Sequence, residues 1–150
     1  MPFLAHRSIA RVTVAAALAG STLVLSAPAD AMTKHTRKHV VAAAAAKKGS
    51  HYKYGAAGPK KFDCSGLVLW AFAKVGRDLP HNSQAQRDAT RDVAADERRL
   101  GDLVFFKSHG RVYHVGIYSG GNKIWHAPRP GRKVSRERIW STHVVYGRVS

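Results

Sequence analysis

Residues 101–127 have the sequence GDLVFFKSHGRVYHVGIYSGGNKIWHA. Three short apolar segments follow one another here, at residues 103–106, 113–119 and 123–127. The last two are separated by Gly120-Gly121-Asn122, which is typical of a tight hairpin turn between antiparallel strands. We therefore predict three consecutive strands of an antiparallel sheet. Val134 and the apolar residues 144–146 indicate two further strands.

Two helices are predicted before these strands. Residues 40–48, VVAAAAAKK, form a helical pattern that ends at Gly49. Residues 65–75 are apolar on almost every side, as in a buried helix. Residues 84–99 carry mixed charges and favour a short helix with a solvated loop. Helices followed by strands indicate an α+β domain, with N-terminal helices packed on a central antiparallel β-sheet.

The first 31 residues have the features of a secretory signal peptide. Arg7 and Arg11 precede the apolar segment 12–25, and Ala29-Asp30-Ala31 forms a cleavage site. The apolar segment is shorter than the ~20 residues that span a bilayer, which argues against an uncleaved anchor. We expect a cleaved signal at 1–31, a basic flexible tail at 32–39 and a catalytic domain at 40–150. The mature protein would be secreted, extracellular or associated with the cell wall, without a transmembrane segment.

Composition limits the possible partners. The chain has 150 residues, 45% of them hydrophobic, which suits one globular domain and excludes general disorder. Its formal net charge of +16 favours an anionic partner. Nucleic acid is not expected, because the chain carries an export signal and lacks a basic stripe interleaved with aromatic residues. Anionic wall polymers fit better, although charge that only keeps the surface soluble explains the excess equally well.

Cys64 is the only cysteine, so no intramolecular disulfide is possible. Asp63 is a natural N-cap for the helix that follows, which places Cys64 at a helix N-terminus. The helix dipole and free N–H groups there stabilise a thiolate, so we expect a lowered thiol pKa and a nucleophilic role. The alternative is that Cys64 is a small buried apolar residue.

Two histidines lie on neighbouring predicted strands. His114 alternates with Val115, so the two side chains point to opposite faces of the strand. His126 lies on the strand after the hairpin, and antiparallel pairing would bring it close to His114. A Cys–His pair with a third orienting group is the arrangement of thiol peptidases. A surface histidine is the alternative for either residue.

Four motifs occur in a fixed order along the chain. They are FDCSGLV at 62–68, GDLVFF at 101–106, HVGIY at 114–118 and WHAP at 125–128. Together they resemble the NlpC/p60 family of secreted bacterial cell-wall cysteine endopeptidases. YKYG at 52–55 is similar to the family's Tyr-x-x-Gly before the nucleophile. The resemblance extends from about residue 40 to residue 148.

The resemblance implies a compact papain-like fold and hydrolysis of peptidoglycan stem peptides through a thioester acyl-enzyme. The bond that such enzymes commonly cut is γ-D-glutamyl–diaminopimelate. By resemblance, Cys64 is the nucleophile, His114 the base and His126 the polar residue that orients His114. Positions that line the substrate groove or the oxyanion region are matched by Tyr52, Asp63 and Ser65. We expect a monomer with stem peptides as partner and without cofactor or metal.

Two departures from the family pattern and three other functions remain. His81-Asn82 replaces the usual Arg-Thr, which affects substrate contacts, and Leu100 replaces a proline before Gly101. An N-acetylmuramoyl-L-alanine amidase would use the same catalytic residues. A zinc site of the cysteine and the two histidines is less favoured, because catalytic zinc ligands are usually spaced more closely. A non-catalytic basic wall-binding protein leaves the order of the motifs unexplained.

Overall fold

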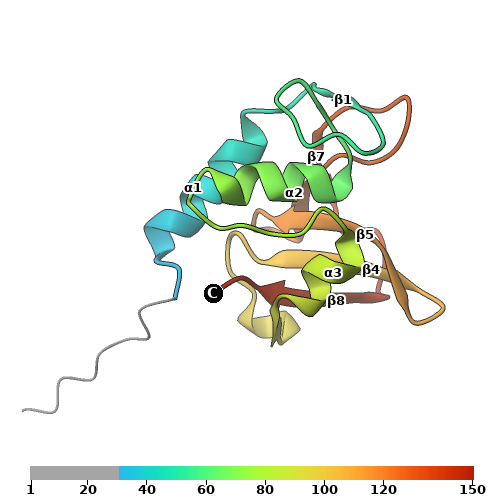
Figure 1. Cartoon of the computed structure of the whole chain (residues 1–150). Coiled ribbons are helices and arrows are strands. Elements are labelled where there is room, and N and C mark those ends of the chain that lie inside the picture. Colours follow the sequence, from blue (N-terminus) through green and yellow to red (C-terminus); the bar gives the residue numbers. More distant parts are fainter. Residues whose placement is uncertain (1–30) are drawn as a thin grey trace, which may run out of the picture.

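A computed structural model describes residues 31–150, which form a six-stranded antiparallel sheet with helices packed against it (Figure 1). The strand order is β3-β8-β4-β5-β6-β7, and every neighbouring pair in this sheet is antiparallel. The sheet strands are β3 (Arg91–Val93), β4 (Leu103–Ser108), β5 (Arg111–Tyr118), β6 (Lys123–His126), β7 (Ser135–Arg138) and β8 (Val144–Arg148). The helices are α1 (Lys34–Ala45), α2 (Cys64–Ala73), α3 (Ser83–Asp88) and the 3₁₀ turn η1 (Ala95–Glu97). The predicted α+β class is confirmed.

The main core lies between α1, α2 and one face of the sheet. In α2, Leu67, Ala71 and Phe72 are fully buried, as expected for a helix that is apolar on nearly every side. The sheet contributes Phe105 of β4 and Ile117 of β5 to the same cluster. Because strand side chains alternate, the intervening residues of these strands face the opposite side.

The opposite face of the sheet carries a second, smaller apolar cluster. Val104 and Phe106 of β4 pack there with Ile124 of β6. Partly buried Ile139 and Tyr146 cover this cluster from the C-terminal part of the chain. The hairpin joining β5 to β6 forms at the predicted Gly120-Gly121-Asn122 turn, and Ile117 pairs with Trp125 across it.

The predicted loose tail at 32–39 is wrong, because α1 begins at Lys34. Thr33 has extended backbone angles, and its side chain accepts a hydrogen bond from the N–H of Thr36 as an N-cap. The Arg37 guanidinium donates to the carbonyl of Met32 at 2.6 Å, and Met32 itself is buried. Basic residues are unfavourable in a first helical turn, and this concealed the helix in the sequence. The predicted signal peptide falls on residues outside those described, apart from Ala31.

The mixed-charge segment 84–99 contains more regular structure than the predicted helix and loop. Asn82 caps α3 by accepting from the N–H of Ala85 at 2.9 Å. The chain then forms edge strand β3, in which Arg91 pairs with Arg148 of β8. Two short strands that we did not predict, β1 (His51–Tyr52) and β2 (Lys61–Phe62), pair in parallel before α2. Among residues 31–150, none of the helices is long and apolar enough to cross a membrane.

Candidate active site

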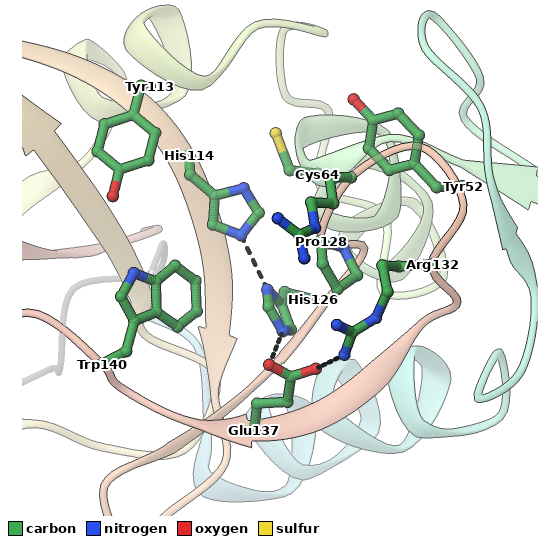
Figure 2. A pocket seen from close by; sticks show the side chains of 10 residues that line it. Tyr52, Cys64, Tyr113, His114, His126, Pro128, Arg132, Glu137 and Trp140 are labelled. Atoms are coloured by element: carbon green, nitrogen blue, oxygen red, sulfur yellow. Dashed lines mark hydrogen bonds and ion pairs between the residues drawn. The ribbon is translucent and has the colours of Figure 1, made fainter.

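Cys64 is the first residue of α2 and opens onto a groove of about 490 Å³. The groove is lined by Tyr52, Cys64, Tyr113, His114, His126, Pro128, Arg129, Arg132, Glu137 and Trp140. These residues come from β1, from α2, and from the chain between β5 and the segment after β7. Of the residues expected to form the site, the structure brings Cys64, both histidines and Tyr52 together here (Figure 2).

Asp63 fixes the start of α2 by joining three segments of the chain. Its carboxylate accepts hydrogen bonds from the N–H of Gly66 at 2.7 Å and of Gly55 at 2.8 Å. The ring of His81 lies 2.8 Å from the same carboxylate. Gly66 is needed because a Cβ there would lie 2.0 Å from the carbonyl oxygen of Ala56. The loop after Tyr52 can therefore approach the helix that carries the nucleophile.

Asp63 and Ser65 do not line the groove. Asp63 is buried and fully occupied by its N–H and imidazole partners. Ser65 is also buried, and its hydroxyl lies 3.4 Å from the Asp63 carboxylate. Both residues hold the start of α2 in place, whereas Tyr52 is open to the groove.

Burial raises the pKa of the Cys64 thiol above its ordinary value, contrary to the lowered pKa expected from the helix N-terminus. Backbone N–H groups of Val115 and Ser65 favour the thiolate, but they do not outweigh the loss of hydration. The negative charge of Asp63 raises the pKa of Cys64 further and so counteracts the helix dipole. At neutral pH Cys64 is therefore a thiol and not a thiolate.

The two histidines are in hydrogen-bond contact. Nε2 of His114 lies 2.9 Å from Nδ1 of His126, and the rings are nearly perpendicular at 79°. In Figure 2 the His114 ring lies between Cys64 on one side and His126 on the other. His114 thus engages His126 through Nε2, which leaves Nδ1 on the side of the nucleophile.

Both imidazoles are neutral at neutral pH. Burial, and secondarily the neighbouring His126, lowers the pKa of His114 to about 3, although Glu137 acts in the opposite direction. Burial also lowers the pKa of His126, again against Glu137. Cys64 and His114 therefore line the groove as a neutral thiol and a neutral imidazole.

Glu137 is a site residue that the sequence analysis missed. Its Oε2 lies 3.4 Å from Nε2 of His126, and its Oε1 accepts from the Ser135 hydroxyl at 2.8 Å and from Arg132 at 3.2 Å. Although burial raises the pKa of Glu137, the Ser135 hydrogen bond, His126 and Arg132 lower it overall. The only sequence signal was the spacing of Ser135 and Glu137, which places both on one face of a short charged strand. The sequence analysis predicted a strand at Val134 but did not extend it to these residues.

Trp140 forms an aromatic wall beside the two histidines. Its ring centroid lies 5.6 Å from that of His114 and 5.3 Å from that of His126. Trp140 is 51% exposed, so part of its indole covers the histidines and part is open to solvent at the groove. Tyr113, 54% exposed, lines the same groove. These rings limit the access of water to the imidazoles.

Comparison with known proteins identifies the family of this chain. The model of the NlpC/P60 family matches residues 49–149. This chain belongs to the NlpC/P60 family. The match includes Cys64, His114, His126 and Glu137, so the whole groove lies inside the NlpC/P60 domain.

Curated relatives of this NlpC/P60 chain carry endopeptidase names. A protein of Corynebacterium glutamicum named "Probable endopeptidase" is 42% identical over 118 residues, covering 77% of this chain and 56% of the relative. The "Bifunctional muramidase/DL-endopeptidase CwlT" of Bacillus subtilis is 39% identical over 109 residues, covering 68% of this chain and 33% of the relative. The chain thus spans about half of the first relative and a third of the second.

Among solved structures, the NlpC/p60 domain of the peptidoglycan hydrolase SagA is 33% identical with a TM-score of 0.68. The match covers 76% of this chain and 97% of that domain. Sequence resemblance, family model and structural neighbour therefore agree on the NlpC/P60 fold. Within residues 31–150, no group of three or more His, Cys, Asp or Glu side chains is arranged to hold a metal ion.

Proposed function

We propose that this protein is a cysteine endopeptidase that cuts the stem peptides of bacterial peptidoglycan. The observation that carries the proposal is the contact of His114 with His126 in one groove with the only cysteine of the chain. A nucleophile, a base and a group that orients the base are the parts that thiol catalysis requires.

The reaction starts from the neutral pair. His114 Nδ1 accepts the thiol proton while Sγ of Cys64 attacks the carbonyl carbon of the scissile amide. The oxyanion that forms lies near the N–H groups of the first turn of α2, where the helix dipole favours negative charge. The His114 imidazolium then returns the proton to the leaving amine, and water hydrolyses the thioester with His114 again as base.

For His114 to act this way, its Nδ1 must carry the lone pair and its Nε2 the proton. The Nε2–H then donates to Nδ1 of His126 at the observed 2.9 Å. This bond holds the ring direction and supports the imidazolium that forms after proton transfer. His126 orients His114 and does not itself exchange a proton with the substrate.

The γ-D-glutamyl–diaminopimelate bond is the substrate that we favour. Both residues of that bond carry free carboxylates, and the groove presents Arg129 and Arg132 on its rim. Among residues 31–150, Glu137 is the only acidic residue lining the groove, and it is engaged by Arg132 and Ser135. Tyr52 and Tyr113 supply apolar walls for the peptide. The name of the relative CwlT supports a DL-endopeptidase over an amidase.

Export and wall binding complete the proposal. The signal peptide predicted at 1–31 would deliver the protein, as a monomer, to the exterior or the cell wall. Removal of residues 1–31, which contain Arg7, Arg11 and Asp30, changes the net charge from +16 to +15, and this charge allows anionic wall polymers to hold the protein near its substrate. A non-catalytic wall-binding role would use the same charge but would not need the histidine pair beside a thiol.

The test is digestion of purified peptidoglycan followed by mass analysis of the fragments. Wild type should release fragments with free γ-D-glutamyl carboxylates and free diaminopimelate amines, and Cys64→Ala should release almost none. Iodoacetamide should inactivate the wild type, because it alkylates the thiol. Release of intact stem peptides from muramic acid would identify an amidase, and loss of activity with a chelator, restored by zinc, would identify a zinc enzyme.

A further inference from the structure

His126 has a buried ring nitrogen that the catalytic scheme leaves unused. The residue is 1% exposed, and its Nδ1 is occupied by His114. Its Nε2 is fully buried and makes no hydrogen bond of good geometry with any described residue. Glu137 Oε2 faces this nitrogen at 3.4 Å. A buried polar atom without a partner is costly, so the nitrogen and the carboxylate are complementary.

We propose that Glu137 is a positioning residue that fixes the tautomer of His126 and, through it, the tautomer of His114. An ionised carboxylate only accepts hydrogen bonds, so it selects the form of His126 with the proton on Nε2. Nδ1 of His126 is then an acceptor, and His114 must donate to it from Nε2. His114 is left with its lone pair on Nδ1, where the base is needed.

Without Glu137, the same hydrogen bond between the two histidines can form with the opposite pair of tautomers. His126 can carry its proton on Nδ1 and donate to Nε2 of His114. His114 then has its proton on Nδ1 and presents N–H, not a lone pair, to Cys64. That arrangement cannot accept the thiol proton, so removal of Glu137 converts part of the protein into an inactive tautomer.

The surroundings of Glu137 hold its carboxylate in place for this role. Ser135 pairs with His126 across the β6–β7 ladder, and its hydroxyl donates to Oε1 at 2.8 Å. Arg132 donates to the same oxygen at 3.2 Å, which leaves Oε2 directed at His126 (Figure 2).

The inference rests on the proposed thiol mechanism, and its kinetic test uses three variants on a defined stem peptide. Glu137→Ala should lower kcat roughly 10- to 100-fold with little change in KM, which is less than the whole contribution of a general base. Glu137→Gln, which keeps an acceptor oxygen without the charge, should lie between this variant and wild type. Glu97→Gln removes the chain's other glutamate, which lies outside the groove, and should keep wild-type kcat.

A double-mutant comparison separates positioning from a general structural effect. If Glu137 acts through His126, Glu137→Ala should lower kcat by less than about twofold in a His126→Asn background. The asparagine in that background has no imidazole tautomer for Glu137 to select. Equal losses in both backgrounds would overturn the proposal. So would an unchanged kcat in Glu137→Ala, or a loss that appears only in KM.

Nitrogen-15 NMR of the histidines gives a readout that does not depend on turnover. Wild type should show His126 with the proton on Nε2 and His114 with the proton on Nε2. Glu137→Ala should show a mixture of tautomers at both rings, while its melting temperature confirms that it remains folded. If wild type shows this tautomer pattern but cleaves no stem peptide, the proposed function fails and the positioning role stands. If it cleaves the peptide with the opposite tautomers, the positioning role alone fails.

Discussion

The indole of Trp140 stacks on the ring of Phe106, with the centroids 4.0 Å apart and the planes 11° apart. Phe106 is fully buried in the smaller apolar cluster and is also 5.5 Å from the ring of His114. The stack therefore fixes a half-exposed aromatic residue beside His114 and His126. The smaller apolar cluster thus supports the side chain that covers the two imidazoles.

Replacing Trp140 should hydrate the histidine pair. Trp140→Ala removes part of the burial that lowers the pKa of His114, so this pKa should rise from about 3 toward its ordinary value. We expect kcat/KM to fall about tenfold, since orientation in the groove is also lost. Titration of the His114 ring by NMR measures the first effect. Trp140→Phe keeps an apolar wall and serves as the control, and a pKa that does not move in Trp140→Ala would contradict the shielding role.

The orienting role of His126 predicts an order of activities. An amide can hold an imidazole by one hydrogen bond, so His126→Asn and His126→Gln should retain a substantial part of the activity. His126→Ala should lose much more, and His114→Ala should be nearly inactive because no base remains. Initial rates on purified peptidoglycan give the order. If the folded amide variants were as inactive as His114→Ala, His126 would have to transfer protons itself.

Burial of His114 should make the protein sensitive to acid. A histidine with a folded pKa of about 3 stays neutral in the folded state, whereas the unfolded chain takes up a proton near its ordinary pKa of 6.5. The unfolded state binds more protons between these values, so stability falls as the pH decreases through them. For this group alone, the free energy of unfolding should decrease by about 2 kcal/mol from about pH 7 to about pH 5.

Urea unfolding at the two pH values measures this change. His114→Gln should flatten the pH dependence by that amount, whatever its effect on stability at neutral pH. The matched control is His143→Gln, which removes an exposed histidine and should leave the pH dependence as in wild type. If the free energy of unfolding of His114→Gln changed with pH as much as that of wild type, the buried imidazole would have to be protonated before the protein unfolds.

The carboxylate preference of the groove can be tested at Arg129. Among residues 31–150, no partner forms a hydrogen bond or ion pair with the Arg129 side chain, although Arg129 lines the groove. Wild type should prefer a peptide with a free D-glutamyl α-carboxylate over its amide by about tenfold in kcat/KM, as for a hydrogen bond to a charged group. Arg129→Gln should reduce this ratio toward one. Arg138→Gln removes an exposed arginine outside the groove, and a similar loss of preference there would implicate general charge.

Among the ion pairs of the fold, we expect that of Arg148 with Asp102 to contribute most to the free energy of unfolding. Both side chains are buried, and the guanidinium donates to the two carboxylate oxygens at 2.7 Å each. Arg148→Met leaves a buried charge unpaired and should cost about 3–5 kcal/mol in the free energy of unfolding. Asp102→Asn with Arg148→Met should recover part of this loss in denaturant unfolding. Arg136→Met, at an exposed arginine of β7, is the control and should cost less than about 1 kcal/mol.

The sequence was sufficient for the parts of the site that lie on long periodic elements. Cys64 follows an N-cap and begins an apolar helix, and His114 lies in a strand with clear alternation. The hairpin glycines fixed which strands are neighbours, and thus the approach of His126 to His114. Local patterns therefore predicted the α+β class and the meeting of the two histidines.

The sequence was insufficient where tertiary contacts override local preference. The first turns of α1 are basic and polar, so their helix depends on the Thr33 cap and on burial of Val40 and Ala44. The pKa of Cys64 depends on burial, which no motif reveals. Glu137 joins the site through strand β7, whose four residues carry no apolar pattern.

Strand β7 is at the edge of the sheet, and its alternation has a consequence for the register of the chain. Ser135 and Glu137 turn inward, so Arg136 and Arg138 face solvent, where their charges keep this open edge from pairing with another molecule. A slip of one residue would exchange the two faces. It would direct an arginine at the buried histidine and turn Ser135 and Glu137 outward, so a misregistered molecule would lose both the carboxylate beside His126 and the arginines that protect its open edge.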